Sequence, residues 1–516
     1  MTVACQLDDV LMKDHSGFNT RPVLVRSCCR RLALLTSLRS VSEPRGIEQL
    51  ALVGQRIATS VPKVRWSSSV AIGVPYSLFS WFRMWQGTTE PTLIWQDSKN
   101  YEAIGAQPLW SSGFWFSGRP PLTPFLWKIT GSPGAFAIGQ TTISIVAWGF
   151  LAWTVSALFA RGWKRTSSFW ILLAFATTTP IALWDRSVLS ESLALSGLAV
   201  LTAAAIRFVQ DVTNRRAAAL VGAAFWCALA RDAEILLPVA FGIVLLLFAL
   251  RQRGRDGYPR LYVVTAGLLF LAAGFCVATV VMSGRDTLNT TDNLYVRVFP
   301  YPARVAWFSS HGMPEARQID RLARSGPPPS PGLAKTVFPN LKAANFAPLD
   351  RWIDRDGSST YALWIIEHPW LIVLEPFRTP ERTFNDAKGD ITSYAALNRV
   401  TSGLTPVLWS PWIWILGIAA LTLVIFDEKD LVLDRTIQII VALGLIGVAN
   451  VFAAWSGDGQ ETTRHTLEGL AAVHLSVLIL FLYVTLTPKP KRSASRRLHG
   501  FTGTIRRGSK VDVDSQ

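Results

Sequence analysis

The stretch LYVVTAGLLFLAAGFCVATVVM, Leu261–Met282, contains no charged residue and is long enough to cross a bilayer as a helix. Three other stretches have the same character: Trp409–Phe426, Thr436–Trp455 and Leu470–Leu486. The composition of the whole chain agrees with them, because 50% of its 516 residues are apolar, only 17% are charged and the mean hydropathy is +0.29. These values are typical of a membrane protein.

Weaker apolar stretches fill much of the remaining chain, and together they predict an all-α polytopic membrane protein with about ten transmembrane helices. The first, Ser69–Gln86, is the weakest, because Pro75 and Arg83 interrupt it. The predicted spans are residues 69–86, 135–160, 168–184, 192–209, 217–231, 235–250, 261–282, 409–426, 436–455 and 470–486.

Basic residues indicate the orientation of these spans. They crowd the first ~66 positions and the C-terminal tail, and they recur at Arg161–Arg165, Arg215–Arg216 and Arg251–Arg260. With ten spans these clusters fall on one side, so we expect both termini to be cytoplasmic. The loop Asp427–Arg435 departs from this pattern, because its acids outnumber its bases, but it does not reverse the prediction.

The formal net charge of +16 does not indicate nucleic-acid binding, because the charge is spread over short cytoplasmic loops and tails. It is better explained by topology and by attraction to anionic lipid head groups. Frequent Ala, Arg and Trp are typical of a GC-rich bacterium. We therefore expect an integral membrane protein of the bacterial plasma membrane.

The chain is predicted to have three parts. Residues 1–66 form a basic cytoplasmic segment, either flexible or with a surface helix at Gly46–Val64, and residues 488–516 form a basic, disordered cytoplasmic tail. Between them, residues 67–487 form the transmembrane domain, with two large non-cytoplasmic loops at 87–134 and 283–408. Both loops are expected to contain short interfacial helices, because tryptophans and loosely amphipathic stretches favour the head-group zone.

Residues that disfavour helices divide the second predicted loop, 283–408, further. Ser325–Gly332, SGPPPSPG, predicts a polyproline-like hinge. Beyond it, Tyr361–Phe377 alternates apolar and polar residues too loosely for a span, and Glu367-His368-Pro369 interrupts it. We therefore expect helices that lie on the membrane there.

The stretch Leu93–Glu102, LIWQDSKNYE, concentrates polar chemistry after the first predicted span, and Gly118–Leu122, GRPPL, follows it. Asp97 and Arg119 would lie among aromatics at the membrane surface, where an ionisable cluster is by default a functional-site hypothesis. Other ionisable residues fall at the same predicted depth, in small loops on the same side: Asp185, Arg186, Glu191, Arg231, Asp232, Glu234, Arg464 and His465.

A transferase that uses a lipid-linked sugar would need these residue types. The planar guanidinium of arginine can hold two phosphate oxygens at once. A carboxylate can take the proton of an acceptor hydroxyl as general base. Because a lipid phosphate is already a good leaving group, the protein's main tasks would be positioning and charge stabilisation.

Each of these residues also has a structural explanation. A single Asp after a span is usually a solvated loop residue, and Arg-Pro is often only a helix start. A surface pair of Arg186 with Glu191 would contribute only ~0–1 kcal/mol. Arg231-Asp232 could cap helices, and Arg464-His465 could be an interfacial anchor. Their joint occurrence on one predicted face favours the functional interpretation.

At these positions the chain resembles the GT-C-fold membrane glycosyltransferases, which use polyprenyl-phosphate sugars. The resemblance covers residues 69–486. The matching motifs are Asp97-Ser98-x-x-Tyr101, Arg119-Pro120-Pro121-Leu122-x-Pro124, Leu189-Ser190-Glu191-Ser192-Leu193, Leu229-Ala230-Arg231-Asp232 before Leu236-Leu237-Pro238, His368-Pro369 and Arg464-His465.

The resemblance implies that Asp97 is the catalytic acid–base carboxylate, that Glu191 is a second catalytic acid, and that Arg231 and Arg464 bind phosphate. The implied substrate-binding set is Tyr101, Arg119, Arg186, Arg231, Asp232, Arg464 and His465. The family often shows two adjacent acids in the first loop, whereas Ser98 follows Asp97 here. This departure puts the use of a divalent metal in doubt, so a divalent metal stays an open alternative for which no ligand residues are assigned, and no other cofactor is predicted.

The sequence therefore predicts a transferase that moves a sugar from a polyprenyl-phosphate donor to a glycan, lipid or protein acceptor in the cell envelope. A transporter or flippase is the main alternative, but transporters tend to show inverted repeats and charges near the midplane, which this sequence lacks. A catalytically inactive GT-C-like membrane protein is the third reading, because Asp97 would act without a second adjacent acid.

Overall fold

The computed structural model describes residues 68–89, 91–252, 259–314, 317, 347–378, 404–409, 413, 417, 419, 421–422, 434–457 and 462–487. The chain divides into two units, Met1–Trp66 and Ser67–Gln516, and every described residue belongs to the second. The predicted segment 1–66, the hinge Ser325–Gly332 and the tail 488–516 therefore lie outside the described residues.

The described part of the chain is helical and contains no strand; its one isolated bridge pairs Leu93 with Ser187. Six of its helical segments are long and apolar enough to cross a membrane, which supports an integral membrane protein. They are α7 (Pro133–Ser156), α10 (Glu191–Gln210), α12 (Leu236–Arg251, preceded by η3, Asp232–Ile235), α13 (Pro259–Ser283), α26 (Arg435–Gly457) and α28 (Leu467–Leu486).

A seventh segment is bent. Helix α8 (Trp163–Ala176) and the following Thr179–Arg186, made of α9 (Thr179–Ala182) and η2 (Leu183–Arg186), meet at 60° and count as one span only if taken together. Pro180 lies just after the bend, where its missing N–H and its ring disfavour a continuous helix.

The remaining predicted spans have mixed outcomes. Residues 69–86 correspond to α3 (Ser68–Thr89) and residues 217–231 to α11 (Asn214–Ala230), neither of which is among the six. Most of 409–426 lies outside the described residues. The prediction of ten spans therefore stays a prediction, whereas the all-α membrane class is supported.

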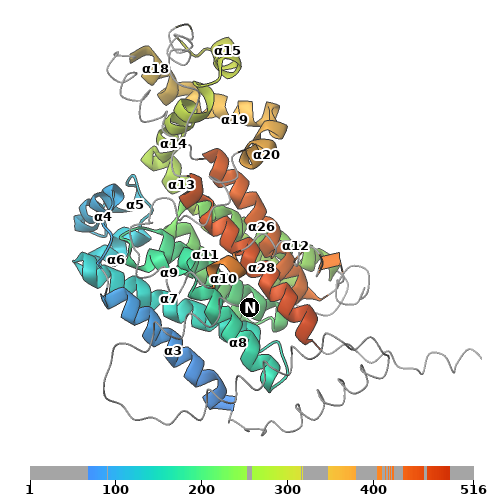
Figure 1. The fold of residues 1–516 in the computed structure, drawn as a ribbon. Helices are drawn as coiled ribbons and strands as arrows, with labels where there is room; N and C mark the ends of the chain where they lie inside the picture. The colour runs from blue at the N-terminus through green and yellow to red at the C-terminus, as the bar shows by residue number, and fades with distance from the viewer. Residues whose placement is uncertain are drawn as a thin grey trace, which may run out of the picture. The chain divides into compact units, whose positions relative to one another are not determined.

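Helix α10 lies at the centre of the bundle and packs against α7, α11, α26 and α28. Its alanine-rich sequence lets these neighbours approach closely, as small residues do in membrane bundles. The pairs α26–α28 and α12–α13 complete the bundle, as Figure 1 shows. Most buried apolar side chains of these helices belong to one continuous core.

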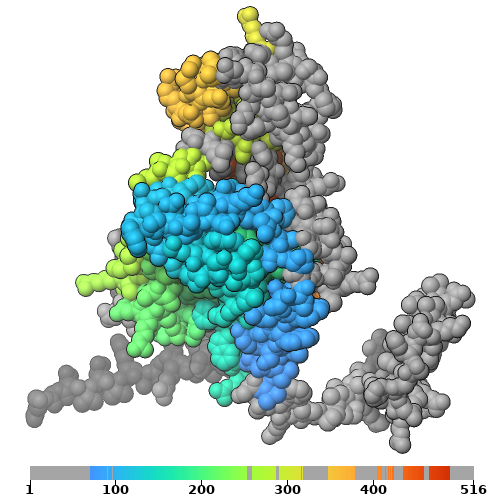
Figure 2. Space-filling model, turned by 90° about the vertical axis from the view of Figure 1, so that its left-hand side faces the viewer, coloured from blue at the N-terminus to red at the C-terminus, as the bar shows by residue number. Residues whose placement is uncertain are grey.

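Three short helices follow α3 and occupy the first predicted loop: α4 (Gln96–Ala106), α5 (Ser112–Trp115) and α6 (Leu122–Thr130). Helices α4 and α6 pack on each other, and α6 packs on α7. In Figure 2 this light-blue to cyan segment forms a continuous layer across one face, next to α3.

A second group of helices follows α13 and has its own hydrophobic core. It comprises α14 (Arg285–Asn293), η4 (Leu294–Val298), α15 (Pro302–Ser310), α18 (Ala347–Trp352), η5 (Ile353–Gly357), α19 (Ser358–Glu367) and α20 (Pro369–Arg378). We call this group the aromatic lobe, because rings such as Phe308, Tyr361 and Trp364 stack at its centre. The predicted interruption at His368-Pro369 is confirmed, since α19 ends before it and α20 begins at it.

Candidate functional site

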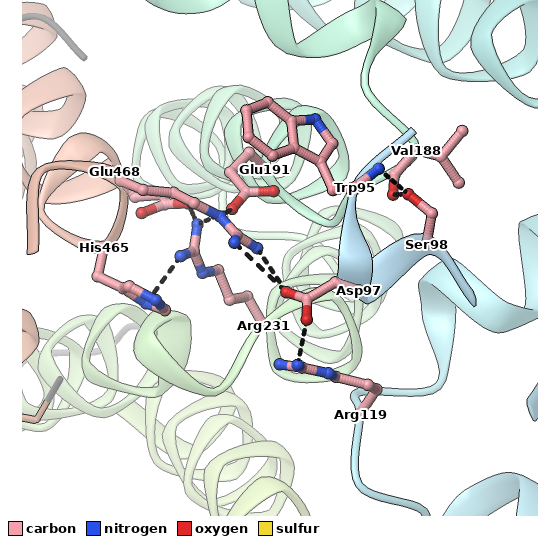
Figure 3. Close-up of polar contacts among 10 residues, drawn as sticks. Trp95, Asp97, Ser98, Arg119, Val188, Glu191, Arg231, His465 and Glu468 are labelled. Carbon is pink, nitrogen blue, oxygen red and sulfur yellow. Dashed lines mark hydrogen bonds and ion pairs between the residues drawn. The ribbon is translucent and has the colours of Figure 1, made fainter. Parts of the chain in front are cut away.

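Hydrogen bonds between two distant segments place Asp97. The Leu93 N–H donates to the Arg186 carbonyl (2.9 Å), and the Val188 N–H donates to the Leu93 carbonyl (3.0 Å). Ser98 Oγ accepts from the Trp95 N–H and donates to the Val188 carbonyl, each at 2.9 Å (Figure 3). These bonds hold the start of α4 beside the start of α10, which begins at Glu191.

The Asp97 carboxylate lies between two arginines. Its Oδ1 accepts from Arg119, and its Oδ2 accepts from both Nη atoms of Arg464 at 3.3 Å. Asp97 also lies in the first turn of α4, where a negative charge is favoured by the helix dipole. Two guanidiniums and the start of a helix therefore surround the Asp97 carboxylate.

A second, deeper layer of charges lies behind Asp97. Arg464 Nε donates to Glu191, and Arg231 lies 3.3 Å from the same Glu191 oxygen. Arg231 also donates to Glu468 and contacts His465 Nδ1 at 2.9 Å, as Figure 3 shows. Helices α4, α10 and α28, the end of α11 and the short α27 (Thr462–His465) thus all contribute to one cluster.

Burial decreases steadily across this cluster. The exposed fraction of the side chain is 0% for Glu191 and Glu468, 6% for Arg231, 11% for Arg464, 17% for Asp97 and 30% for Arg119. Buried charges are tolerated only when they are paired, and each inner carboxylate has its arginine. The outer residues are the ones that a ligand can reach.

Tyr101 lines the same cluster from α4 and is buried. Burial raises the pKa of its phenol above the ordinary value, and the nearby Glu191 carboxylate adds to the rise. The Tyr101 side chain therefore stays a neutral hydrogen-bond donor beside the charged groups.

These contacts bring Asp97, Glu191, Arg231 and Arg464 together, and Tyr101, Arg119 and His465 join them. Their functional roles stay predictions. Two other predicted site residues lie in different contacts, described next.

Arg186 does not form the surface pair with Glu191 that we considered. It is buried, and its guanidinium donates to the Pro91 carbonyl at 2.9 Å, which fixes the segment leading to α4. Asp232 pairs with Arg285 at 2.9 Å. Arg285 in turn donates to the Ser117 carbonyl at 2.8 Å, so Asp232 supports the loop that carries Arg119.

Sequence reasoning missed three charged residues of this region. Glu468 lies in the first turn of α28, and an acid at the start of an apolar span is a signal for a buried partner. Arg83 had been treated only as an interruption of a span, yet it is buried and pairs with Asp185. Arg285 lies at the first position after Gly284, and no motif had pointed to it.

Among the described residues, no group of three or more His, Cys, Asp or Glu side chains is arranged to hold a metal ion. The chain matches no protein-family model and no curated protein.

Proposed function

We propose that the protein is a GT-C-like membrane glycosyltransferase, which moves a sugar from a polyprenyl-phosphate donor to an acceptor on the non-cytoplasmic face. The observation that supports this most is Asp97, a partly exposed carboxylate held between Arg119 and Arg464 at the edge of a buried ionic cluster. The proposal includes ten spans, two cytoplasmic termini and a place in the bacterial plasma membrane.

In the proposed reaction Asp97 acts as the general base. It takes the proton of an acceptor hydroxyl while that oxygen bonds to the anomeric carbon of the sugar. The bond between this carbon and the phosphate oxygen breaks, and the electron pair leaves with the polyprenyl phosphate. Arginines beside the departing phosphate stabilise the charge that develops on it.

The contacts favour Arg119 and Arg464 as the phosphate ligands. Arg119 is the most exposed arginine of the cluster, and Arg464 contacts Asp97 through both Nη atoms at a relatively long 3.3 Å. A phosphate that took the place of Asp97 on these two guanidiniums would keep both charges paired. The same exchange would release the Asp97 carboxylate to accept a proton, so donor binding would activate the base.

Arg231 has a different role in this proposal. The resemblance assigned it to the phosphate, but its guanidinium already contacts Glu468, Glu191 and His465 in a buried position. We therefore assign Arg231 to positioning: it neutralises the inner carboxylates, and Glu191 in turn orients Arg464. Glu191 acts through Arg464 and supports the reaction without a proton transfer of its own.

One observation favours the alternative of a transporter or flippase. The span formed by α8 and the following Thr179–Arg186 is broken by 60°, and discontinuous helices are common at transporter binding sites. The ionic cluster supports the enzyme more, because Asp97 and Arg119 lie at its exposed edge and not within a span. The third possibility is that the ionic cluster only stabilises the fold and has no catalytic role.

The test uses the full chain in nanodiscs with a panel of polyprenyl-phosphate sugars. Release of free polyprenyl phosphate reports transfer to an added acceptor, or to water when none is present. A parallel assay in proteoliposomes follows movement of a fluorescent lipid-linked sugar between leaflets. Release supports the transferase, movement without release supports the flippase, and neither activity with any donor of the panel contradicts both.

A further inference from the structure

Helix α20 of the aromatic lobe has two different faces. Leu371 and Ile372 pack against the core of the lobe, and Glu375 is buried in an ion pair with Arg304 of α15. The opposite face carries Trp370, Leu374 and Val373, whose exposed fractions are 74%, 49% and 39%. Positions 370, 373 and 374 follow the i, i+3, i+4 spacing of a single helical stripe.

The position of α20 indicates what covers this stripe. Helix α20 packs against α26, and the rings of Phe377 and Phe452 lie 6.1 Å apart. Phe452 lies near the end of α26, which ends at Gly457. Figure 1 shows α20 beside this end of α26. Further along the same span, Leu445 is 67% exposed, as expected for a lipid-facing side chain.

We propose that α20 rests on the bilayer, with Trp370, Val373 and Leu374 inserted at the boundary between head groups and acyl chains. Its apolar stripe continues the exposed apolar surface of α26, and tryptophan is favoured at that depth. The sequence had predicted interfacial helices throughout Tyr361–Phe377. The structure favours α20 for this role, because α20 exposes a tryptophan within its stripe, whereas α19 buries Tyr361 and Trp364 inside the lobe and exposes Leu363 and Ile366. The proposal is independent of the proposed function.

Such an anchor would set the position of the lobe relative to the cluster. The lobe is joined to the end of α26 by Tyr361, which donates to the Ser456 carbonyl at 3.0 Å, and by Arg297, which lies over the Trp455 ring. The short helix α27, which carries Arg464, is the next described segment after α26. A lipid contact at α20 would therefore hold the lobe and this segment at one membrane depth.

The test measures the environment of single spin labels on the full chain in nanodiscs of phosphatidylglycerol and phosphatidylethanolamine. One label is placed by Leu374→Cys, a bilayer reference by Leu445→Cys, and a water reference by Ser310→Cys, an exposed position of the same lobe. Collision rates with oxygen and with a water-soluble nickel chelate are compared. Cys227 and Cys276 are buried and are kept, and the other cysteines of the sequence, Cys5, Cys28 and Cys29, are first replaced by serine.

The expected result is an oxygen-to-nickel ratio at Leu374 that lies between the ratios at Leu445 and Ser310 and is several-fold higher than at Ser310. A ratio equal to that at Ser310 would show that the stripe faces water. Low rates with both reagents would show that protein covers it, and dipolar broadening between labels would identify a second copy as the cover; each overturns the proposal. If Leu374→Cys does not fold, Val373→Cys repeats the measurement on the same stripe.

Discussion

The Asp97 carboxylate and the Arg464 guanidinium lie within 3.3 Å of each other, although 367 positions separate them in the chain. Asp97 comes from the segment after α3, and Arg464 comes from the segment before the last span. The contact therefore forms only when the first and the last helices of the bundle are packed together. A variant that disturbs bundle packing should alter this cluster even when it lies far from Asp97.

Replacing Asp97 by Asn tests the proposed base. The amide keeps the shape of the side chain but cannot accept the proton, so we expect turnover to fall by about 10²–10⁴-fold. Binding of polyprenyl phosphate should be at least as tight as in the wild type, because Arg119 and Arg464 remain and no longer pair with a carboxylate at position 97. The measurement is release of polyprenyl phosphate from a sugar donor, together with donor affinity.

Glu102→Gln is the matched control for Asp97→Asn. It makes the same chemical change on the same helix, but at an exposed position. We expect wild-type turnover for this variant. Unchanged turnover in Asp97→Asn would remove the carboxylate from the mechanism, whereas equal loss in both variants would point to damage of α4.

The arginines of the cluster should separate into two classes. Arg464→Ala and Arg119→Ala each remove a charge-assisted contact worth about 1.5–3 kcal/mol. We therefore expect the affinity for polyprenyl phosphate to fall by about 10–150-fold. The free energy of unfolding of Arg119→Ala should stay near that of the wild type. Lysine should restore only part of this affinity, because it cannot hold two oxygens in one plane.

Arg231→Ala should mainly reduce stability. It leaves Glu468 buried without its partner, which typically costs about 3–5 kcal/mol. Adding Glu468→Gln should recover much of that loss, because the uncompensated charge is removed. Thermal unfolding in detergent measures both variants. A stable Arg231→Ala variant that has lost donor binding would instead return Arg231 to the phosphate site.

Much of the cluster was predictable because its members are charged residues beside apolar stretches. Glu191 and Arg464 lie close to predicted spans and Asp97 lies in the predicted loop after the first span, so a common membrane side could be inferred from the sequence alone. Pairing could not be inferred. Whether Glu191 faces Arg186 or Arg464 depends on how α10 is rotated against its neighbours, and that is set by side-chain packing.

Arg83 shows the limit of hydropathy as a signal. A charged residue lowers the mean hydropathy of α3 and makes the span look weak, although the guanidinium is buried and bonded to the Ala176 carbonyl and to Asp185. The exposed side of α3 is apolar, with Trp81 and Leu78 on its surface. The mean hydropathy over a sequence window averages the polar and the apolar face of α3, whereas the three-dimensional structure shows them on opposite sides of the helix.

The Arg83–Asp185 pair gives a prediction about stability. Asp185→Asn removes one charge of a fully buried pair, and we expect a loss of about 3–5 kcal/mol. Replacing both partners by leucine should be much less destabilising than Asp185→Asn. Asp211→Asn is the control, because its pair with Arg216 is exposed and should contribute less than about 1 kcal/mol. Equal losses at Asp185 and Asp211 would contradict the burial of the first pair.

Two glycines at the crossing of α26 and α28 link this packing to the cluster. A Cβ on Gly447 would lie 2.7 Å from the Gly469 carbonyl oxygen, and a Cβ on Gly469 would lie equally close to the Gly447 oxygen. Backbone atoms cannot move aside as a flexible side chain can. Alanine at either position should therefore separate the helices and destabilise the protein by about 1–3 kcal/mol.

Turnover should fall as well, because Gly469 directly follows Glu468, whose carboxylate binds Arg231. Gly267→Ala on α13 is the control: apart from its chain neighbours and the backbone of its own helix, no atom lies within 4 Å of the added methyl group, and alanine favours the helix by up to about 1 kcal/mol. Thermal unfolding and donor turnover are measured for Gly469→Ala and Gly267→Ala together. If both variants behave like the wild type, the close approach of α26 and α28 does not hold the cluster in place.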